Sequence, residues 1–374
     1  MKEGSAGAFL SSIPYYMRTH LPQRSAMSPQ DSAQNAAVGA DSRLSELKQW
    51  LGALPGAPVQ ADSIRPASSD ASFRRYFRVD GNDGKTYIAM DAPPPQEDVR
   101  PFARVAELFG ATGVSVPRIL AGDEARGFLL LTDLGSTTYL HQLSPDSAHK
   151  LYLDAIDALV LIQAQSKPGV LPEYDRALLQ RELDLFPEWY VGRHLGVQMN
   201  DKQRGLLDKV FEALLANNLA QPKVYVHRDY HSRNLMVLGQ GNPGILDFQD
   251  AVHGPITYDL VSLLRDAYIQ WDEEQLLDWA IRYWERARRA GLPVPADVDS
   301  FYRDFEFMGL QRHLKVLGIF ARLYYRDGKD AYLNDLPLVM EYARKTAGRY
   351  RELAPLIVLL DEFDNKAPAV GYTF

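Results

Sequence analysis

Three polar residues have the types and the spacing that phosphoryl transfer needs. Asn234 follows Asp229 by five positions, and Asp247 follows Asn234 by thirteen. A carboxylate at Asp229 can accept the proton of an acceptor hydroxyl, so we predict that it is the catalytic base and contacts the substrate. The amide oxygen of Asn234 and the carboxylate of Asp247 are hard ligands that suit Mg²⁺ held against the phosphates of ATP. We therefore predict that all three residues are catalytic, that Asn234 and Asp247 bind the metal, and that the cofactors are ATP and Mg²⁺.

Short apolar runs beside these residues predict the elements that hold them. Lys223–Val226 precedes the first acidic turn, and Leu235–Leu238 and Gly244–Leu246 lie between Asn234 and the second one. These runs have the length and composition of buried strands. Lone Asp or Asn residues usually mark ordinary turns, but two matched spacings beside strand-like runs argue against coincidence.

The order of residues in this stretch resembles the catalytic loop of the protein-kinase-like superfamily. It runs His227-Arg228-Asp229, then Asn234, then Asp247-Phe248-Gln249, with Gln in place of the usual Gly. That replacement resembles the aminoglycoside phosphotransferase-like small-molecule kinases. The resemblance implies an α+β, bilobal protein-kinase-like fold, with a small β-rich N-lobe carrying one long helix and a larger, mainly helical C-lobe. We place a nucleotide-binding N-lobe at residues 41–133 and a catalytic and substrate-binding C-lobe at residues 134–374.

The N-lobe sequence predicts a nucleotide site made of a polar loop and a hinge. The loop Ala67–Ser72 precedes a predicted strand at Phe73–Val79, and Gly81–Gly84 predicts a hairpin turn into a strand at Thr86–Met90. The loop lacks the G-x-G-x-x-G pattern, and by itself a polar turn is the simpler explanation. Its small residues would let backbone N–H groups approach phosphate, and a hinge at Leu131–Gly135 would let backbone groups meet adenine. The predicted nucleotide-binding residues are Ser68, Ser69, Ala71, Ser72, Arg75 and Asp133.

Periodicity and capping residues predict the next elements. Apolar residues at helical spacing indicate a helix at Asp98–Phe109, and Val114–Pro117 has the composition of a strand. Ser144-Pro145 predicts the start of a helix, because Ser can cap it and Pro fits its first position. Tyr174–His194 is predicted to be one helix, kinked by Pro187.

The position that usually carries a phosphate-binding lysine, at the end of the third strand, is Met90. Methionine cannot neutralise phosphate, so either another cation substitutes or the chain is a pseudokinase. Side-chain alternation along the preceding strand places Arg75 and Arg78 on opposite faces, and Lys85 follows the hairpin turn. We favour Arg75, although a solvated surface role explains each of these cations equally well. If Arg75 binds the phosphates, its replacement by Ala should raise the KM for ATP.

Five longer stretches resemble a narrower group, the bacterial anomeric sugar kinases that phosphorylate N-acetylmuramate and N-acetylglucosamine at the 1-hydroxyl in cell-wall recycling. This group shares a Met at the position of Met90, so the absent lysine is a feature of the group. The resemblance implies ATP-dependent transfer to a sugar hydroxyl, with Asp229 as the base and Asn234 and Asp247 on the metal. It also implies that Asp259 braces the catalytic loop, for which helix N-capping is the alternative role. The stretches are Ala67–Phe77, Met90–Glu97, Glu182–Tyr190, Asp247–Pro255 and Met308–Lys315.

An amino-sugar substrate suggests further contacts. An anomeric hydroxyl is more acidic than an ordinary alcohol, so a carboxylate base of modest strength would serve. The lactyl carboxylate of N-acetylmuramate would need a cation, for which we predict Arg312, and Arg233 completes the predicted polar contacts. Trp189 and Tyr190 are candidates for stacking on the sugar, although core packing explains aromatic residues without the resemblance. Other cations near these positions are Arg193, His194, His313 and Lys315.

Composition limits the partners and the compartment. The 374 residues carry a net charge of −7 with a pI near 5.7, which predicts no broad basic surface for nucleic acid. The chain has no Cys, so it has no disulfide and no thiolate metal site, and this fits a reducing cytosol. Residues 1–40 form a poor secretory signal and are expected to be disordered or an upstream extension, and no apolar run is long enough to cross a bilayer. We expect a cytoplasmic monomer that acts on a small molecule, without a nucleic-acid or membrane partner.

Two other functions remain open at this point. One is another small-molecule kinase of the same fold, acting on an aminoglycoside, choline or homoserine. A polycationic drug would need a pocket lined with carboxylates, and Asp361-Glu362-Asp364 is the obvious acidic cluster. The other is a non-catalytic nucleotide-binding module, which Met90 would suit but the intact Asp229, Asn234 and Asp247 argue against.

Overall fold

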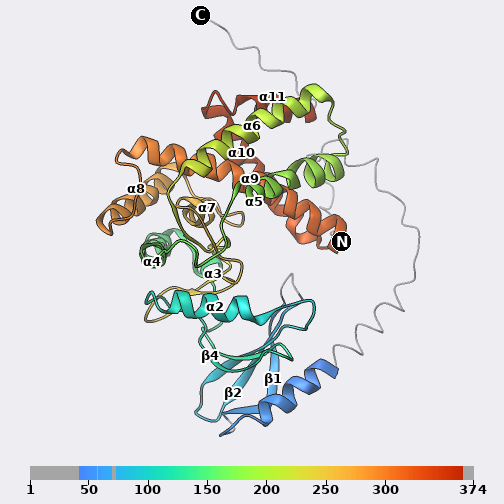
Figure 1. Cartoon of the computed structure of the whole chain (residues 1–374), viewed down its shortest axis with the longest axis vertical. Coiled ribbons are helices and arrows are strands. Elements are labelled where there is room, and N and C mark those ends of the chain that lie inside the picture. The colour runs from blue at the N-terminus through green and yellow to red at the C-terminus, as the bar shows by residue number, and fades with distance from the viewer. Residues whose placement is uncertain (1–41, 57, 70–72, 365–374) are drawn as a thin grey trace, which may run out of the picture.

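The computed structural model describes residues 42–56, 58–69 and 73–364 (Figure 1). The predictions for residues 1–40, Ala71 and Ser72, and for the side chains of Ser68 and Ser69, lie outside the described residues. Figure 1 shows a small lobe built on a β-sheet and a larger helical lobe, with α2 lying between them. The predicted α+β, bilobal protein-kinase-like fold is confirmed.

The small lobe contains a five-stranded antiparallel sheet with the order β1-β2-β3-β5-β4. The hairpin turn predicted at Gly81–Gly84 joins the second strand to the third, and Gly84 takes the left-handed conformation with φ of 79°. The strand expected at Val114–Pro117 is wrong, because Ser115 makes only an isolated bridge to Gly244. Pro117 has no N–H to donate to a ladder, and the strand starts after it. The strands are β1 (Val59–Ser69), β2 (Arg75–Gly81), β3 (Thr86–Asp91), β4 (Ile119–Asp123) and β5 (Phe128–Thr132).

The two faces of this sheet pack against different helices. On one face, the helix at residues 42–52 places Leu47, Trp50 and Leu51 in a small core with Phe77 and other strand residues. The opposite face carries Met90 and lies in the main core with α2 (Val99–Gly110). The sheet therefore has one face toward the outer helix and the other toward α2.

The large lobe is organised around α9 (Val298–Asp327), which contacts α5, α6, α7 and α10. The helix start predicted at Ser144-Pro145 is confirmed, because Ser144 forms a capping box with Ser147. The helix expected over Tyr174–His194 is instead α5 (Arg176–Leu185) followed by a π-helix, η2 (Phe186–His194), which begins beside Pro187. The other elements are α3 (Tyr139–Gln142), α4 (Pro145–Ala164), α6 (Asp201–Ala220), β6 (Lys223–Val226), β7 (Leu235–Met236), β8 (Gly244–Ile245), β9 (Val252–Pro255), α7 (Tyr258–Leu264), α8 (Glu273–Arg289), η3 (Asp330–Asp335), α10 (Leu336–Arg349) and α11 (Ala354–Phe363).

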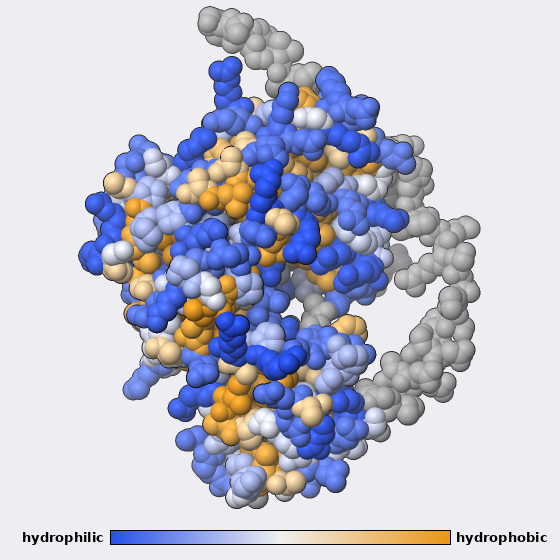
Figure 2. Space-filling model, in the orientation of Figure 1, coloured by the Kyte–Doolittle hydropathy of each residue, from blue (hydrophilic) through white to orange (hydrophobic). Residues whose placement is uncertain are grey.

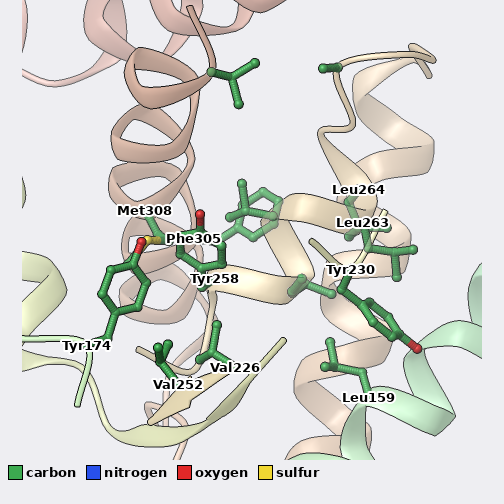
Figure 3. Packing of buried hydrophobic residues seen from close by; sticks show 14 of the residues in the cluster. Leu159, Tyr174, Val226, Tyr230, Val252, Tyr258, Leu263, Leu264, Phe305 and Met308 are labelled. Carbon is green, nitrogen blue, oxygen red and sulfur yellow. The ribbon is translucent and has the colours of Figure 1, made fainter. Parts of the chain in front are cut away.

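One hydrophobic core extends from the small lobe into the large lobe. Phe102 of α2 packs on Phe248, with ring centroids 4.9 Å apart, and Phe109 lies 6.0 Å from the same ring. Figure 3 shows the part of this core under the catalytic loop, where Tyr230 extends toward α4 and Leu159. The hydroxyl of Tyr230 donates to the carbonyl of Ala155 on that helix at 2.8 Å. The catalytic loop is therefore anchored on a packed base.

The outer surface seen in Figure 2 is mostly hydrophilic, with apolar residues in separate groups among charged ones. Among the described residues, no helix combines the length and the apolar character needed to cross a membrane.

Candidate active site

The loop after β6 brings Asp229, Asn234 and Asp247 to one place. Asn234 Nδ2 donates to the backbone carbonyl of Asp229 at 3.0 Å and lies 3.5 Å from Asp247 Oδ2. The backbone N–H of Leu246 donates to the carbonyl of Asn234 at 2.9 Å, which holds the acidic turn beside the loop. The three predicted residues therefore share one site, with Asn234 between the two acidic residues.

Asp247 and Asn234 offer a donor set that fits Mg²⁺. Asp247 has φ of 63°, a left-handed conformation that non-glycine residues adopt mainly where function or packing holds them. Gln249 Nε2 donates to Asp247 Oδ1 at 2.9 Å, so the residue that replaces the usual Gly orients this carboxylate. Mg²⁺ usually takes one or two protein ligands, so its other ligands would be phosphate oxygens and water.

His227 connects the catalytic loop to the acidic turn. Its Nε2 lies 2.9 Å from the carbonyl oxygen of Leu246, which it can meet only as a donor, and its Nδ1 accepts from the N–H of Asp229 at 3.2 Å. Burial lowers the pKa of His227 to about 4. The imidazole is therefore neutral at neutral pH and serves as a structural link between the two motifs.

Asp259 braces the catalytic loop, as the resemblance implied. Its Oδ2 accepts from the N–H of His227 at 2.6 Å, and its Oδ1 accepts from the N–H of Arg228 at 2.9 Å. Arg228 has φ of 78°, so these bonds hold a strained backbone. The alternative role is not seen, because Thr257 is the N-cap residue of α7 and makes no side-chain capping bond. Burial raises the pKa of Asp259 to about 7.

The carboxylate of Asp229 belongs to a buried electrostatic network. Burial alone would raise the pKa of Asp229, but Lys315, Arg228 and the neighbouring histidines hold it below its usual value. Lys315 Nζ lies 2.9 Å from Glu182 Oε1 and donates to the hydroxyl of Tyr258 at 2.9 Å. Arg228 pairs with the same Glu182 carboxylate. Asp229 is thus ionised at neutral pH and can accept a hydrogen bond from a hydroxyl.

Two arginines stand near the catalytic loop. Arg312 of α9 is 4% exposed, and its Nη1 has no hydrogen-bond partner within the part of the chain that the structure describes. Burial lowers the pKa of His231, and the positive charges of Arg312 and Arg233 lower it further. Arg233 is exposed, and its guanidinium lies 3.5 Å from the ring centroid of Tyr268. A buried guanidinium with an unused donor beside a catalytic loop fits an anionic ligand.

The two aromatic candidates have different environments. Tyr190 is 9% exposed and stacks on Phe186, with ring centroids 5.5 Å apart. Burial raises the pKa of Tyr190 to about 12, and nearby Asp364 adds to the rise. Tyr190 therefore packs within the large lobe, and its position argues against the predicted sugar contact. Trp189 is half-buried on the same π-helix and remains a candidate.

The hinge carboxylate of Asp133 has protein partners. It accepts from Arg78 Nε at 2.5 Å, from Thr86 Oγ1 at 2.7 Å and from the N–H of Gly135 at 2.9 Å. Burial alone would raise the pKa of Asp133, but these bonds, that of Arg78 above all, hold it below its usual value. A cavity of about 850 Å³ lies against this segment, lined in part by Thr86, Asp133 and Leu134. The Asp133 side chain thus braces the hinge, where the N–H of Gly135 is bonded to Asp133 and its carbonyl accepts from Arg78.

Arg75 lies on the sheet face away from the catalytic loop. Its guanidinium pairs with buried Asp91, which also pairs with Arg43 of the helix at residues 42–52. A nucleotide bound against Asp247 would lie on the other face, where Met90 packs with α2. This position argues against the predicted phosphate contact of Arg75.

Several known proteins match most of this chain. Residues 63–292 match the family described as APH, phosphotransferase enzyme family. The N-acetylmuramate/N-acetylglucosamine kinase of Neisseria meningitidis serogroup B is 53% identical over 334 residues, which cover 88% of this chain and 98% of that protein. The protein of the same name from Pseudomonas aeruginosa is 49% identical over 337 residues, covering 88% and 99%. A third, from Caulobacter vibrioides, is 32% identical over 335 residues, covering 78% and 89%.

Solved structures with a similar fold include small-molecule kinases. The ADP-bound aminoglycoside phosphotransferase APH(2'')-Ib matches with a TM-score of 0.53 and 15% identity, covering 80% of this chain and 98% of that one. A choline/ethanolamine kinase family protein from Mesorhizobium loti matches with a TM-score of 0.57 and 14% identity, covering 86% and 99%. Identities this low establish a shared fold and no more.

Proposed function

The chain belongs to the phosphotransferase enzyme family, and from this premise we propose that it transfers the terminal phosphoryl group of ATP to the anomeric hydroxyl of N-acetylmuramate, N-acetylglucosamine or both. Its family and its relatives make it an ATP-dependent kinase that acts on an alcohol group. The observation that carries the proposal is the position of Asn234, which contacts both Asp229 and Asp247. We further propose that the protein works as a cytoplasmic monomer without a nucleic-acid partner.

In the proposed reaction Asp229 orients the acceptor hydroxyl and takes its proton. A carboxylate with a lowered pKa is a weak base, which suffices because phosphoryl transfer depends mainly on positioning and charge stabilisation. The relatively acidic anomeric hydroxyl suits such a base. Asn234 and Asp247 would hold Mg²⁺, which neutralises phosphate charge when bound.

Arg312 supports an anionic acceptor such as N-acetylmuramate. Its side chain is buried beside His231, two residues after the catalytic base, and its Nη1 donor is unused among the described residues. A lactyl carboxylate would satisfy that donor in a charge-assisted hydrogen bond. In this proposal Arg233 and Trp189 form the outer part of the acceptor site.

The acidic cluster considered for a polycationic drug is partly paired with one arginine. Arg344 Nη1 lies 2.7 Å from Asp361, and its Nη2 lies 2.7 Å from Asp364. Arg344 would therefore compete with an aminoglycoside for these carboxylates, and no second function is proposed.

ATP turnover with a panel of acceptors tests the proposal. The purified protein should phosphorylate N-acetylmuramate or N-acetylglucosamine, and not kanamycin, choline or homoserine. Asp229→Asn should reduce kcat by about 10²–10⁴-fold, the usual contribution of a general base. Phosphorylation of kanamycin but of neither amino sugar would reject the proposed substrates. Nucleotide binding without phosphorylation of any acceptor would favour a non-catalytic module.

A further inference from the structure

The proposed use of ATP needs a cation that the third strand does not provide. Kinases of this fold usually place a Lys there against the nucleotide phosphates. Here that position is Met90, which is fully buried in the main core. Arg75, the cation first expected to replace it, pairs with Asp91 on the far face of the sheet. Arg78 is on the Met90 face, but its guanidinium is bound to Asp133 of the hinge. The proposed use of ATP therefore calls for another cation on that face.

Arg74 is on that face and next to the loop that precedes β2. Tyr76 pairs with Met90 and Arg75 pairs with Asp91 in the sheet register. Because side chains alternate along the chain, Arg74 shares the face of Tyr76 and Met90, opposite Arg75. The Arg74 side chain is 11% exposed, and its Nε lies 3.5 Å from Glu97 Oε2, just before α2 begins.

The charge of Arg74 interacts with those of Asp247, Glu97 and Asp250. Burial alone would lower the pKa of Arg74, but Tyr76, Asp247, Glu97 and Asp250 raise it above its usual value. The guanidinium is thus close enough to the predicted metal ligand Asp247 for their charges to interact. Together with the sheet register, this puts a permanent positive charge on the side of the sheet that faces the metal site.

We infer that Arg74 contacts the phosphates of the nucleotide and that Glu97 positions its guanidinium. In this inference the pair takes the place of the usual strand Lys and its helix Glu, with Arg74 just before β2 and Glu97 just before α2. Arginine suits this task because its planar donors can bind two phosphate oxygens at once. The inference rests on the proposed use of ATP and adds the residue that recognises its charge.

Nucleotide binding, measured by calorimetry on the full chain, tests this inference without relying on turnover. Arg74→Gln should weaken the binding of Mg·ADP by roughly 10–100-fold, the range expected when a charge-assisted contact is lost. The same variant should bind adenosine like the wild type, because adenosine has no phosphate. Arg74→Lys should recover part of the loss, and Glu97→Gln should show a smaller one.

Arg65→Gln is the matched control, because Arg65 is an exposed cation of the same sheet that pairs with Asp80 on the protein surface. It should bind Mg·ADP unchanged. Wild-type affinity for Mg·ADP in Arg74→Gln would overturn the inference, and so would an equal loss of adenosine and Mg·ADP, which would mean a structural role. If the wild type binds Mg·ADP through Arg74 but phosphorylates no sugar, the proposed function fails while this inference stands.

Discussion

Lys315→Met removes the cation that most lowers the pKa of Asp229 and keeps an apolar side chain of similar length. Lys315 is 7% exposed, and its Nζ is 2.9 Å from Glu182 Oε1. Its loss leaves a buried carboxylate with one cationic partner fewer. Breaking a buried ion pair costs about 3–5 kcal/mol, and we expect the lower end because Glu182 keeps Arg228 and Tyr174.

The same variant should change the pH dependence of catalysis. Because Lys315 lowers the folded-state pKa of Asp229, its removal raises that pKa. A protonated Asp229 cannot take the hydroxyl proton, so the acid limb of kcat/KM should move to higher pH. In the wild type, the low pKa stabilises the folded state above the unfolded pKa of Asp, and this stabilisation is lost as the pH falls through the folded pKa.

Two measurements separate these effects. Urea denaturation gives the stability change, and kcat/KM across the acid and neutral range gives the shift of the acid limb. Lys345→Met is the control, because Lys345 is an exposed cation that pairs with Glu273 at the surface. It should change the free energy of unfolding by less than about 1 kcal/mol and leave the acid limb where it is in the wild type. A destabilised Lys315→Met enzyme whose acid limb coincides with that of the wild type would refute the electrostatic role.

Three further predictions follow from the site. Asp259→Asn should lower the free energy of unfolding by about 1–3 kcal/mol in urea denaturation, because the amide offers one acceptor oxygen to two backbone N–H groups; an unchanged midpoint would contradict the brace. Arg312→Gln should raise the KM for N-acetylmuramate by roughly tenfold or more and leave that for N-acetylglucosamine unchanged, whereas an equal rise for both sugars would indicate a structural role. Gln249→Gly should raise the Mg²⁺ concentration needed for half-maximal rate about 10–100-fold, because the hydrogen bond that orients Asp247 is lost. An unchanged Mg²⁺ titration would contradict this role of Gln249.

The proximity of Asp229, Asn234 and Asp247 could be predicted from the sequence because short-range structure positions them. Leu235 pairs with Ile245 in the β7–β8 ladder, so the residues flanking that pair, Asn234 and Leu246, are also bonded. A fixed spacing along the chain therefore becomes a fixed distance in space. The brace by Asp259 follows from a similar pairing, because His227 and Arg228 come directly after β6 and Asp259 follows β9, the strand that pairs with β6.

The geometry argues against the predicted contacts of Arg75 and Tyr190, whose positions depend on contacts between distant segments. Side-chain alternation along β2 correctly places Arg75 and Arg78 on opposite faces of the sheet. Which of the two faces is covered by the helix at residues 42–52 depends on tertiary packing. Tyr190 lies in the π-helix that follows α5, and no local sequence pattern predicts this change of helix type. Glu182 was missed as a partner of Lys315, although its position among the apolar residues of α5, beside Leu183, was a usable sign of burial.

The packing of Phe102 against Phe248 determines how the protein tolerates being cut. Separated from the rest, the first lobe would expose the part of α2 that packs on the large lobe, including Phe102 and Phe109, which contact Phe248. An exposed apolar surface of that kind promotes aggregation, so we expect each lobe to aggregate when it is produced alone. A protease that nicks the connection between Asp133 and Thr138 should instead leave two polypeptides that elute together in gel filtration and separate only in denaturant.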